Sequence, residues 1–162
     1  LTNDYWTCGY WLANNERKGG GGRFRLIHIP PGATITHAYL KLTARSTDNL
    51  PNVNTRLRGE LNINPTTFGA IADYLARERT AAVVDWDDIP PWTLGTQYQS
   101  PDIKTIIQEI VNLDGWASGN PLVIFWDDHD DRSAHTSYTV RRARSWNHTL
   151  KTPPILYIEW TA

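Results

Sequence analysis

The sequence predicts an all-β fold, a jelly-roll or Greek-key β-sandwich that carries two short helices. Three observations support this prediction. Short stretches of alternating apolar and polar residues recur along the chain, clusters of Gly, Pro, Asn and Asp separate them, and only two segments show helical spacing. The 162 residues are enough for one well-packed core, so we expect a single domain over residues 1–162.

The clearest β pattern lies in residues 23–44, which predict two strands joined by a turn at residues 30–32 (Pro-Pro-Gly). The second strand has a period of two, as a half-buried strand requires. Its apolar face holds Ala38, Leu40, Leu42 and Ala44. The first strand alternates less regularly, so we expect a bulge there or a strand buried on both faces.

The segment before this pair, residues 1–22, predicts an aromatic first strand over residues 1–11 and then a loop. Four consecutive glycines occupy residues 19–22. Because glycine has no Cβ and disfavours regular structure, we expect residues 14–22 to form a mobile, exposed loop.

The middle of the chain predicts a strand over residues 55–63, with Leu57 facing inward and Arg56 and Arg58 facing outward. A short amphipathic helix is expected over residues 68–79. A strand over residues 81–86 leads into a proline-containing loop that presents Trp92.

The second helix has the strongest local signal, because Ser100, Pro101 and Asp102 all favour helix initiation. Isoleucines at helical spacing then form one face: Ile103, Ile106, Ile107 and Ile110. Three further strands are expected over residues 121–126, over residues 137–146 and after the prolines at 153–154, the last with Leu156, Ile158 and Trp160 facing inward.

Composition excludes several classes of protein. The formal net charge of −1 argues against a nucleic-acid binder, and no apolar run approaches the ~18 residues of a membrane span. The single cysteine, Cys8, cannot form an internal disulfide and is expected to be buried. The absence of Met indicates that a leader has been removed or that the chain is a fragment. Eight Trp and seven Tyr favour a binding role.

Several segments, taken in order, resemble the DNRLRE-type domains, extracellular jelly-roll modules that include alginate-binding and disaggregatase-associated carbohydrate-binding modules. The segments are Arg-Phe-Arg-Leu at 23–26, Ile-Pro-Pro-Gly-Ala-Thr-Ile-Thr-His-Ala-Tyr-Leu-Lys-Leu at 29–42, residues 80–86 with the prolines after them, residues 100–111, Gly-Trp-Ala-Ser-Gly-Asn at 115–120 and Pro-Pro-Ile-Leu-Tyr-Ile-Glu-Trp at 153–160. Residues 86–88 are Trp-Asp-Asp, where that family usually has Trp-Asn-Asn. The resemblance implies an extracellular jelly roll over residues 23–161.

No motif for catalysis is present: there is no Gly-x-Ser-x-Gly, no His-Glu-x-x-His and no phosphate-binding glycine loop. We therefore expect a protein that is not an enzyme. The candidate metal site is an acidic loop that could supply oxygen ligands for a structural calcium ion: Asp127, Asp128, Asp130 and Asp131. The alternative is a solvated acidic turn paired with nearby arginines.

The candidate carbohydrate-binding residues are arginines, which pair with carboxylates, and tryptophans, which stack on sugar rings: Arg56, Arg58, Trp92, Arg141, Arg142 and Trp146. The alternative for the arginines is cross-strand salt bridging. Trp86, Trp116 and Trp160 are expected in the core. Asn147 begins a glycosylation sequon in a turn.

Two functions follow as hypotheses. The first is a non-catalytic module, extracellular or on a particle surface, for adhesion or for binding an acidic polysaccharide. The second is a structural subunit or decoration protein of a virion, fibre or filament, which would assemble with copies of itself through a strand edge such as residues 5–11.

Overall fold

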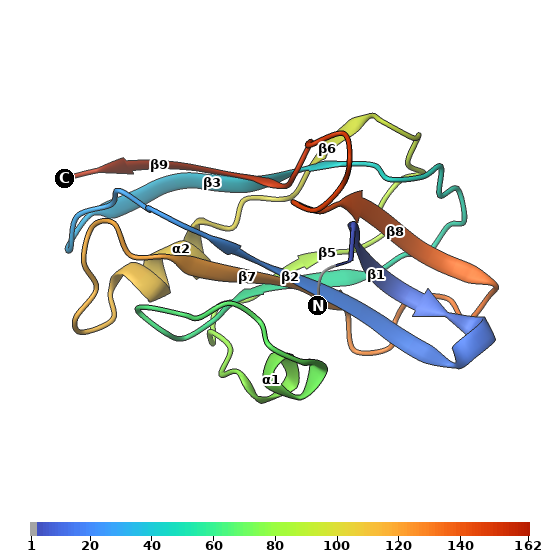
Figure 1. Ribbon diagram of the computed structural model, residues 1–162, viewed down its shortest axis with the longest axis horizontal. Helices are drawn as coiled ribbons and strands as arrows, with labels where there is room; N and C mark the ends of the chain where they lie inside the picture. Colours follow the sequence, from blue (N-terminus) through green and yellow to red (C-terminus); the bar gives the residue numbers. More distant parts are fainter. Residues whose placement is uncertain (1–2) are drawn as a thin grey trace.

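The computed structural model describes residues 3–162 as a β-sandwich of two antiparallel sheets (Figure 1). The larger sheet has six strands in the order β5-β4-β7-β2-β1-β8, and the smaller has three in the order β6-β3-β9. The strands of this part of the chain are β1 (Tyr5–Trp11), β2 (Glu16–Phe24), β3 (Thr34–Thr43), β4 (Thr55–Gly59), β5 (Val84–Trp86), β6 (Gln97–Gln99), β7 (Leu122–Asp128), β8 (Tyr138–Arg144) and β9 (Ile155–Thr161). The all-β sandwich is confirmed, whereas the jelly-roll connectivity stays a prediction.

One apolar core fills the space between the two sheets. From the small sheet, β3 contributes the alternating face that the sequence predicts, with Ala38, Leu40 and Leu42 fully buried. From the large sheet, β7 contributes Leu122, Ile124 and Trp126, also fully buried. Cys8 of β1 lies in the same core, which confirms its predicted burial.

The prediction that the two strands in residues 23–44 pair with each other is wrong. β2 ends at Phe24 and is bonded to β1 and β7, while β3 belongs to the opposite sheet. Residues 25–33 cross from one sheet to the other, and Ile29 and Ala33 are buried in the core on the way. The irregular alternation in this stretch therefore reflects a connection between layers.

The glycine segment is the largest departure from the sequence prediction. Residues 19–22 form the middle of β2, paired with β7, and not a mobile loop. Aromatic rings cover both faces of this strand. A Cβ at Gly22 would lie 2.2 Å from the Trp6 ring, and one at Gly21 would lie 3.0 Å from Phe68. Glycine is required here because side chains from neighbouring elements already occupy the space above and below the backbone.

The second predicted helix is found as α2 (Lys104–Val111), and the isoleucines at 103, 106, 107 and 110 are fully buried. Its predicted start at Ser100–Asp102 is wrong: Ile103 is the N-cap, and the Ser100 hydroxyl instead accepts from the Leu40 amide of β3. The first is shorter than predicted: α1 (Ile71–Ala76) has only six residues. Its Tyr74 is buried against the large sheet, but Ile71 and Leu75 are 62% and 69% exposed. No helix in residues 3–162 is long and apolar enough to cross a membrane.

Two strand predictions near the chain ends need correction. β1 lies between β2 and β8, so residues 5–11 offer no edge for strand addition. In β9, Leu156 and Ile158 pack against the core as expected, but Trp160 is 40% exposed because it lies near the end of the sheet. Trp86 and Trp116 are buried as predicted.

Candidate functional site

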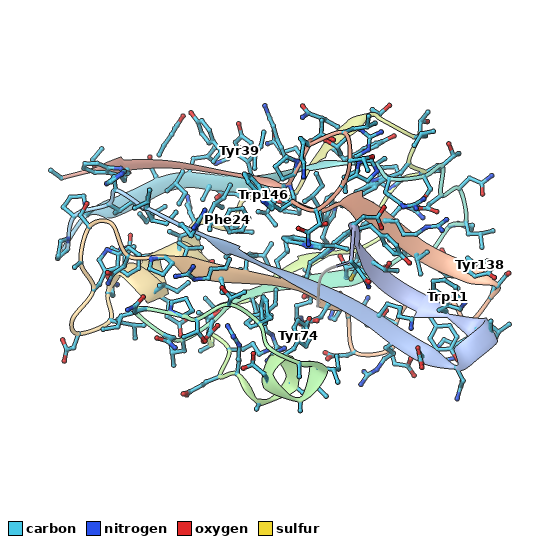
Figure 2. The ribbon with its side chains drawn as sticks, viewed as in Figure 1. Trp11, Phe24, Tyr39, Tyr74, Tyr138 and Trp146 are labelled. Carbon is cyan, nitrogen blue, oxygen red and sulfur yellow. The ribbon has the colours of Figure 1, made fainter. Side chains whose placement is uncertain are left out.

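A groove of about 630 Å³ lies on the outer face of the large sheet, between α1 and the strands β2, β4 and β7. Figure 2 shows Tyr74 between α1 and this sheet. The groove is rich in cations and also holds acids. Its principal lining residues are Arg17, Lys18, Arg56, Arg58, Tyr74 and Asp127.

Strand register brings these residues together. Asp127 of β7 lies opposite Gly19 of β2 on one side and opposite Arg56 of β4 on the other. Because side chains alternate along a strand, Arg56 and Arg58 point to the outer face while Leu57 is buried between them. The predicted outward direction of both arginines is therefore confirmed.

The floor of the groove is a hydrogen-bonded pair. The Tyr74 hydroxyl donates to Asp127, and a Cβ at Gly19 would collide with both groups. Burial raises the pKa of Asp127, although the Tyr74 hydrogen bond and the charge of Arg79 oppose this shift. Burial and the neighbouring Asp127 carboxylate raise the pKa of Tyr74.

Arg79 closes the floor beneath α1. Its guanidinium lies 4.0 Å from the Phe125 ring centre and donates to the Tyr74 carbonyl at 2.9 Å. One guanidinium nitrogen is also 4.0 Å from an oxygen of Asp127. Arg79 therefore holds α1 on the sheet and balances the buried carboxylate, so both of its roles are structural.

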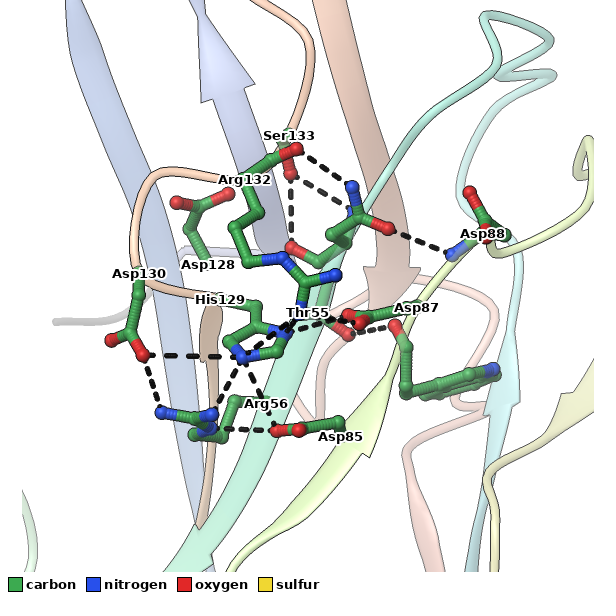
Figure 3. Close-up of polar contacts among 12 residues, drawn as sticks. Thr55, Arg56, Asp85, Asp87, Asp88, Asp128, His129, Asp130, Arg132 and Ser133 are labelled. Carbon is green, nitrogen blue, oxygen red and sulfur yellow. Dashed lines mark hydrogen bonds and ion pairs between the residues drawn. The ribbon is translucent and has the colours of Figure 1, made fainter.

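Arg56 belongs to an ion-pair network that forms one wall of the groove (Figure 3). Its Nε donates to Asp85 at 2.7 Å and its Nη1 donates to Asp130 at 2.6 Å. The hydrogen bond from Arg56 lowers the pKa of Asp85. The buried His129 joins the network through its Nε2, which lies 2.5 Å from an Arg56 nitrogen, and its Nδ1 lies 2.7 Å from Asp87. Arg56 is thus fully engaged within the protein.

Arg58 differs from Arg56, two residues earlier. Within residues 3–162 its guanidinium makes no hydrogen bond or ion pair, and its Nε is buried. The Nη nitrogens of Arg58 are not among the buried atoms without a partner, so they can meet an external acceptor in the groove, whereas the buried Nε is closed to one. Arg58 is the cation of the groove best placed to receive a ligand.

Four of the six candidate carbohydrate-binding residues lie elsewhere. Trp92 is fully buried, not presented on a loop: its ring stacks on Tyr98 at 4.7 Å. The proline-containing loop returns to the core because Trp92 and Asp48 form a backbone bridge. Trp92 therefore has no surface with which to meet a sugar.

Arg141 is also fully buried, and it donates to the carbonyls of Pro90 and Leu50 at 2.9 and 3.0 Å. Arg142 forms an ion pair with the buried Asp48. Arg141 and Arg142 therefore both hold nearby loops in place, and the salt bridge of Arg142 is made with a loop residue and not across strands. Neither one lines the groove.

Trp146 and Asn147 lie in the loop between β8 and β9. Trp146 is 70% exposed, and Asn147 is exposed in a turn as the sequence predicts. They are not among the residues that line the groove. The set of six predicted binding residues is therefore divided among the groove, the interior and this separate loop.

The four aspartates of the predicted calcium loop have different partners. Asp127 accepts from Tyr74, while Asp128 accepts from the backbone of Asp131 at 2.9 Å. Asp130 pairs with Arg56, and Asp131 pairs with His135 at 2.8 Å. Among residues 3–162, no three His, Cys, Asp or Glu side chains are grouped as a metal ion would require. Only Asp130 and Asp131 have a basic partner at hydrogen-bond distance, neither partner is an arginine of β8, and the Asp128 Oδ1 is buried without a partner among residues 3–162.

Arg17, Lys18, Tyr74 and Arg79 line the groove but were not predicted. The first two precede the glycine segment, which as a loop would have no fixed position. The signal in the sequence that could have found Tyr74 was the buried face of α1, which places this residue on the sheet.

In comparisons with known proteins, no family model matches the chain and no curated protein matches it significantly. The resemblance to DNRLRE-type domains therefore stays a prediction.

Proposed function

We propose that the chain is a non-catalytic binding module that takes a carboxylate-bearing saccharide in the groove on the outer face of the large sheet. The observation that carries this proposal is the guanidinium of Arg58, which lines the groove and makes no hydrogen bond or ion pair within residues 3–162. A guanidinium pairs with a carboxylate through two parallel hydrogen bonds, so an acidic sugar would supply what Arg58 lacks.

The shape and polarity of the groove also favour a sugar. Its volume of about 630 Å³ lies within the ~300–1,000 Å³ typical of small-ligand sites. The exposed side chains of Ile71 and Leu75 line it beside the cations. Sugars present apolar C–H faces next to hydroxyl and carboxylate groups, which suits a groove that mixes apolar and charged walls.

Two carboxylates of the groove are engaged within the protein, which favours a non-catalytic role. Asp127 is bound by Tyr74 and lies near Arg79, and Asp130 is paired with Arg56. General acid and base catalysis would require a carboxyl group that can exchange a proton with the ligand. A module of this kind would act outside the cell or on the surface of a particle, which is part of the same proposal.

The test is a titration of uronic-acid oligosaccharides, with neutral oligosaccharides of equal length as the comparison. Arg58→Gln should weaken binding of the acidic series at least tenfold. Arg25→Gln removes an exposed arginine that does not line the groove, so it should leave affinity within twofold. Equal loss in both variants would mean that binding depends on net charge alone, and an unchanged Arg58→Gln affinity would refute the proposal.

A second candidate function is a structural subunit that assembles through a sheet edge. The specific observation in its favour is β9, an edge strand with exposed Ile155, Tyr157 and Trp160. The original suggestion of residues 5–11 as the shared edge does not hold, since β1 is internal.

A further inference from the structure

The last strand, β9, forms one edge of the three-stranded sheet and lies along the periphery of the molecule (Figure 1). Within residues 3–162 it pairs only with β3, through a register that places Tyr157 opposite Tyr39. The two rings stack at 4.7 Å. One side of β9 is therefore bonded to β3, and the other side has no strand beside it.

The hydrogen bonds of β3 show which groups of β9 face outward. The amides of Ser100 and Ile103 donate to the carbonyls of Leu40 and Ala38, on the side of β3 away from β9. Because peptide groups alternate in direction along a strand, Tyr39 and its alternate neighbours bond to β9. Their partners in β9 are Ile155, Tyr157 and Glu159.

The remaining residues of β9, Leu156, Ile158 and Trp160, therefore direct their N–H and C=O groups to the open edge. Edge strands are usually protected by a proline, a lysine or an inward-pointing charge. β9 has none of these within its seven residues, and its only charge, Glu159, is on the outer face. The outward N–H and C=O groups of β9 can therefore pair with another strand along its length.

We infer that β9 pairs antiparallel with β9 of a second copy of this chain, about a two-fold axis at Ile158. In this register Ile158 lies opposite the partner's Ile158, and Leu156 lies opposite the partner's Trp160. All three outward-facing residues of each strand then find a donor and an acceptor. The two small sheets join into one continuous sheet of six strands.

Side chains select this register over its neighbours. A change of the β9–β9 register that keeps the same side chains on each face of the sheet moves the two-fold axis by one residue. Centring it on Tyr157 would place the partner's Pro154 opposite Trp160, where proline has no N–H to donate. Centring it on Glu159 would place two carboxylates face to face. With the axis at Ile158, Tyr157 lies opposite the partner's Glu159. Leu156 then covers the partner's Trp160, which is otherwise exposed.

This association is independent of the groove, which lies on the other sheet, and it would supply the contact that the structural-subunit function needs. A contact limited to one pair of seven-residue strands is small. We therefore expect a dimer that dissociates on dilution.

Cysteine cross-linking tests both the contact and its register. The native Cys8 is buried, so a cysteine introduced on β9 is the reactive thiol. Ile158→Cys places two thiols on the axis. Thr161→Cys, on the same strand, places them roughly 20 Å apart at ~3.4 Å per residue. Under mild oxidation, Ile158→Cys should form the disulfide-linked dimer at least tenfold faster. Equal rates, or faster linkage of Thr161→Cys, would overturn the inference.

Sedimentation equilibrium over a wide concentration range supplies an independent readout. The wild-type chain should show a reversible monomer–dimer equilibrium. Ile158→Pro should be folded by circular dichroism yet monomeric at all concentrations, because the lost N–H faces the open edge. Arg58→Gln should dimerise like the wild type, which separates this inference from the groove. A wild-type chain that stays monomeric, or a dimer that survives Ile158→Pro, would refute it.

Discussion

The glycine strand β2 makes a quantitative prediction about packing at Gly22. An added Cβ would lie 2.2 Å from Cζ2 and 2.5 Å from Cη2 of Trp6, whereas carbon atoms pack at about 3.5–4.0 Å. The Trp6 ring would have to move by roughly 1.3–1.8 Å. Overpacking of this kind costs about 1–3 kcal/mol, and Gly→Ala returns about 0.4–1 kcal/mol through the unfolded chain. We expect Gly22→Ala to destabilise the fold by about 1–2 kcal/mol.

The assay is urea unfolding followed by far-ultraviolet circular dichroism, which remains usable when a tryptophan is replaced. Trp6→Leu removes the colliding ring atoms, so in that background Gly22→Ala should be neutral or slightly stabilising. Gly69→Ala is the matched control, because the nearest atom to its Cβ is 4.0 Å away and its effect should stay within about 0.5 kcal/mol. A cost at Gly22 that is equal in both backgrounds would refute the role assigned to Trp6.

Three further predictions concern buried charges and the acidic loop. Arg77→Met should destabilise the protein by about 3–5 kcal/mol in urea unfolding, because it leaves the buried Glu60 without its ion-pair partner. The double variant Arg77→Met with Glu60→Leu should recover most of this loss. A double variant as unstable as Arg77→Met would contradict this reason. Burial raises the pKa of Asp127 in the folded state. The Asp127 carboxyl group therefore contributes its full stabilisation below its pKa in the unfolded chain, about 3.9, and this stabilisation is lost as the pH rises through its pKa in the folded protein. Wild-type stability relative to Asp127→Asn should therefore fall with increasing pH in unfolding titrations, and a constant difference would be inconsistent with this sign. A chelator should leave the melting temperature unchanged, because the carboxylates at 127–131 have partners within the chain; a lower melting temperature, restored by calcium, would show that the loop binds metal.

Much of the fold could be predicted from the sequence because its signals are local. The alternation in β3 and the isoleucine spacing of α2 each depend on one element and the direction of its own side chains. The same reasoning placed Arg56 and Arg58 on the outer face of β4. It also placed Cys8, Trp86 and Trp116 in the interior, where apolar burial stabilises the fold.

The groove required information that no single segment holds. It forms where β2, β4, β7 and α1 meet, and strand register, not sequence distance, places Gly19, Asp127 and Arg56 in one row. The burial of Trp92 likewise depends on a loop returning to the core through its bridge with Asp48.

The sequence by itself determined the all-β class, the inward face of β3, the helix α2 and the outward direction of Arg56 and Arg58. Only the tertiary structure decided that four glycines lie within a strand and that Arg141 and Trp92 are interior. It also decided that, among residues 3–162, Arg56 has ion-pair partners and Arg58 has none. The physical reason is that periodicity reports which way a side chain points along its own element. Its neighbours, and therefore its burial and its unmet hydrogen bonds, come from segments distant in the chain.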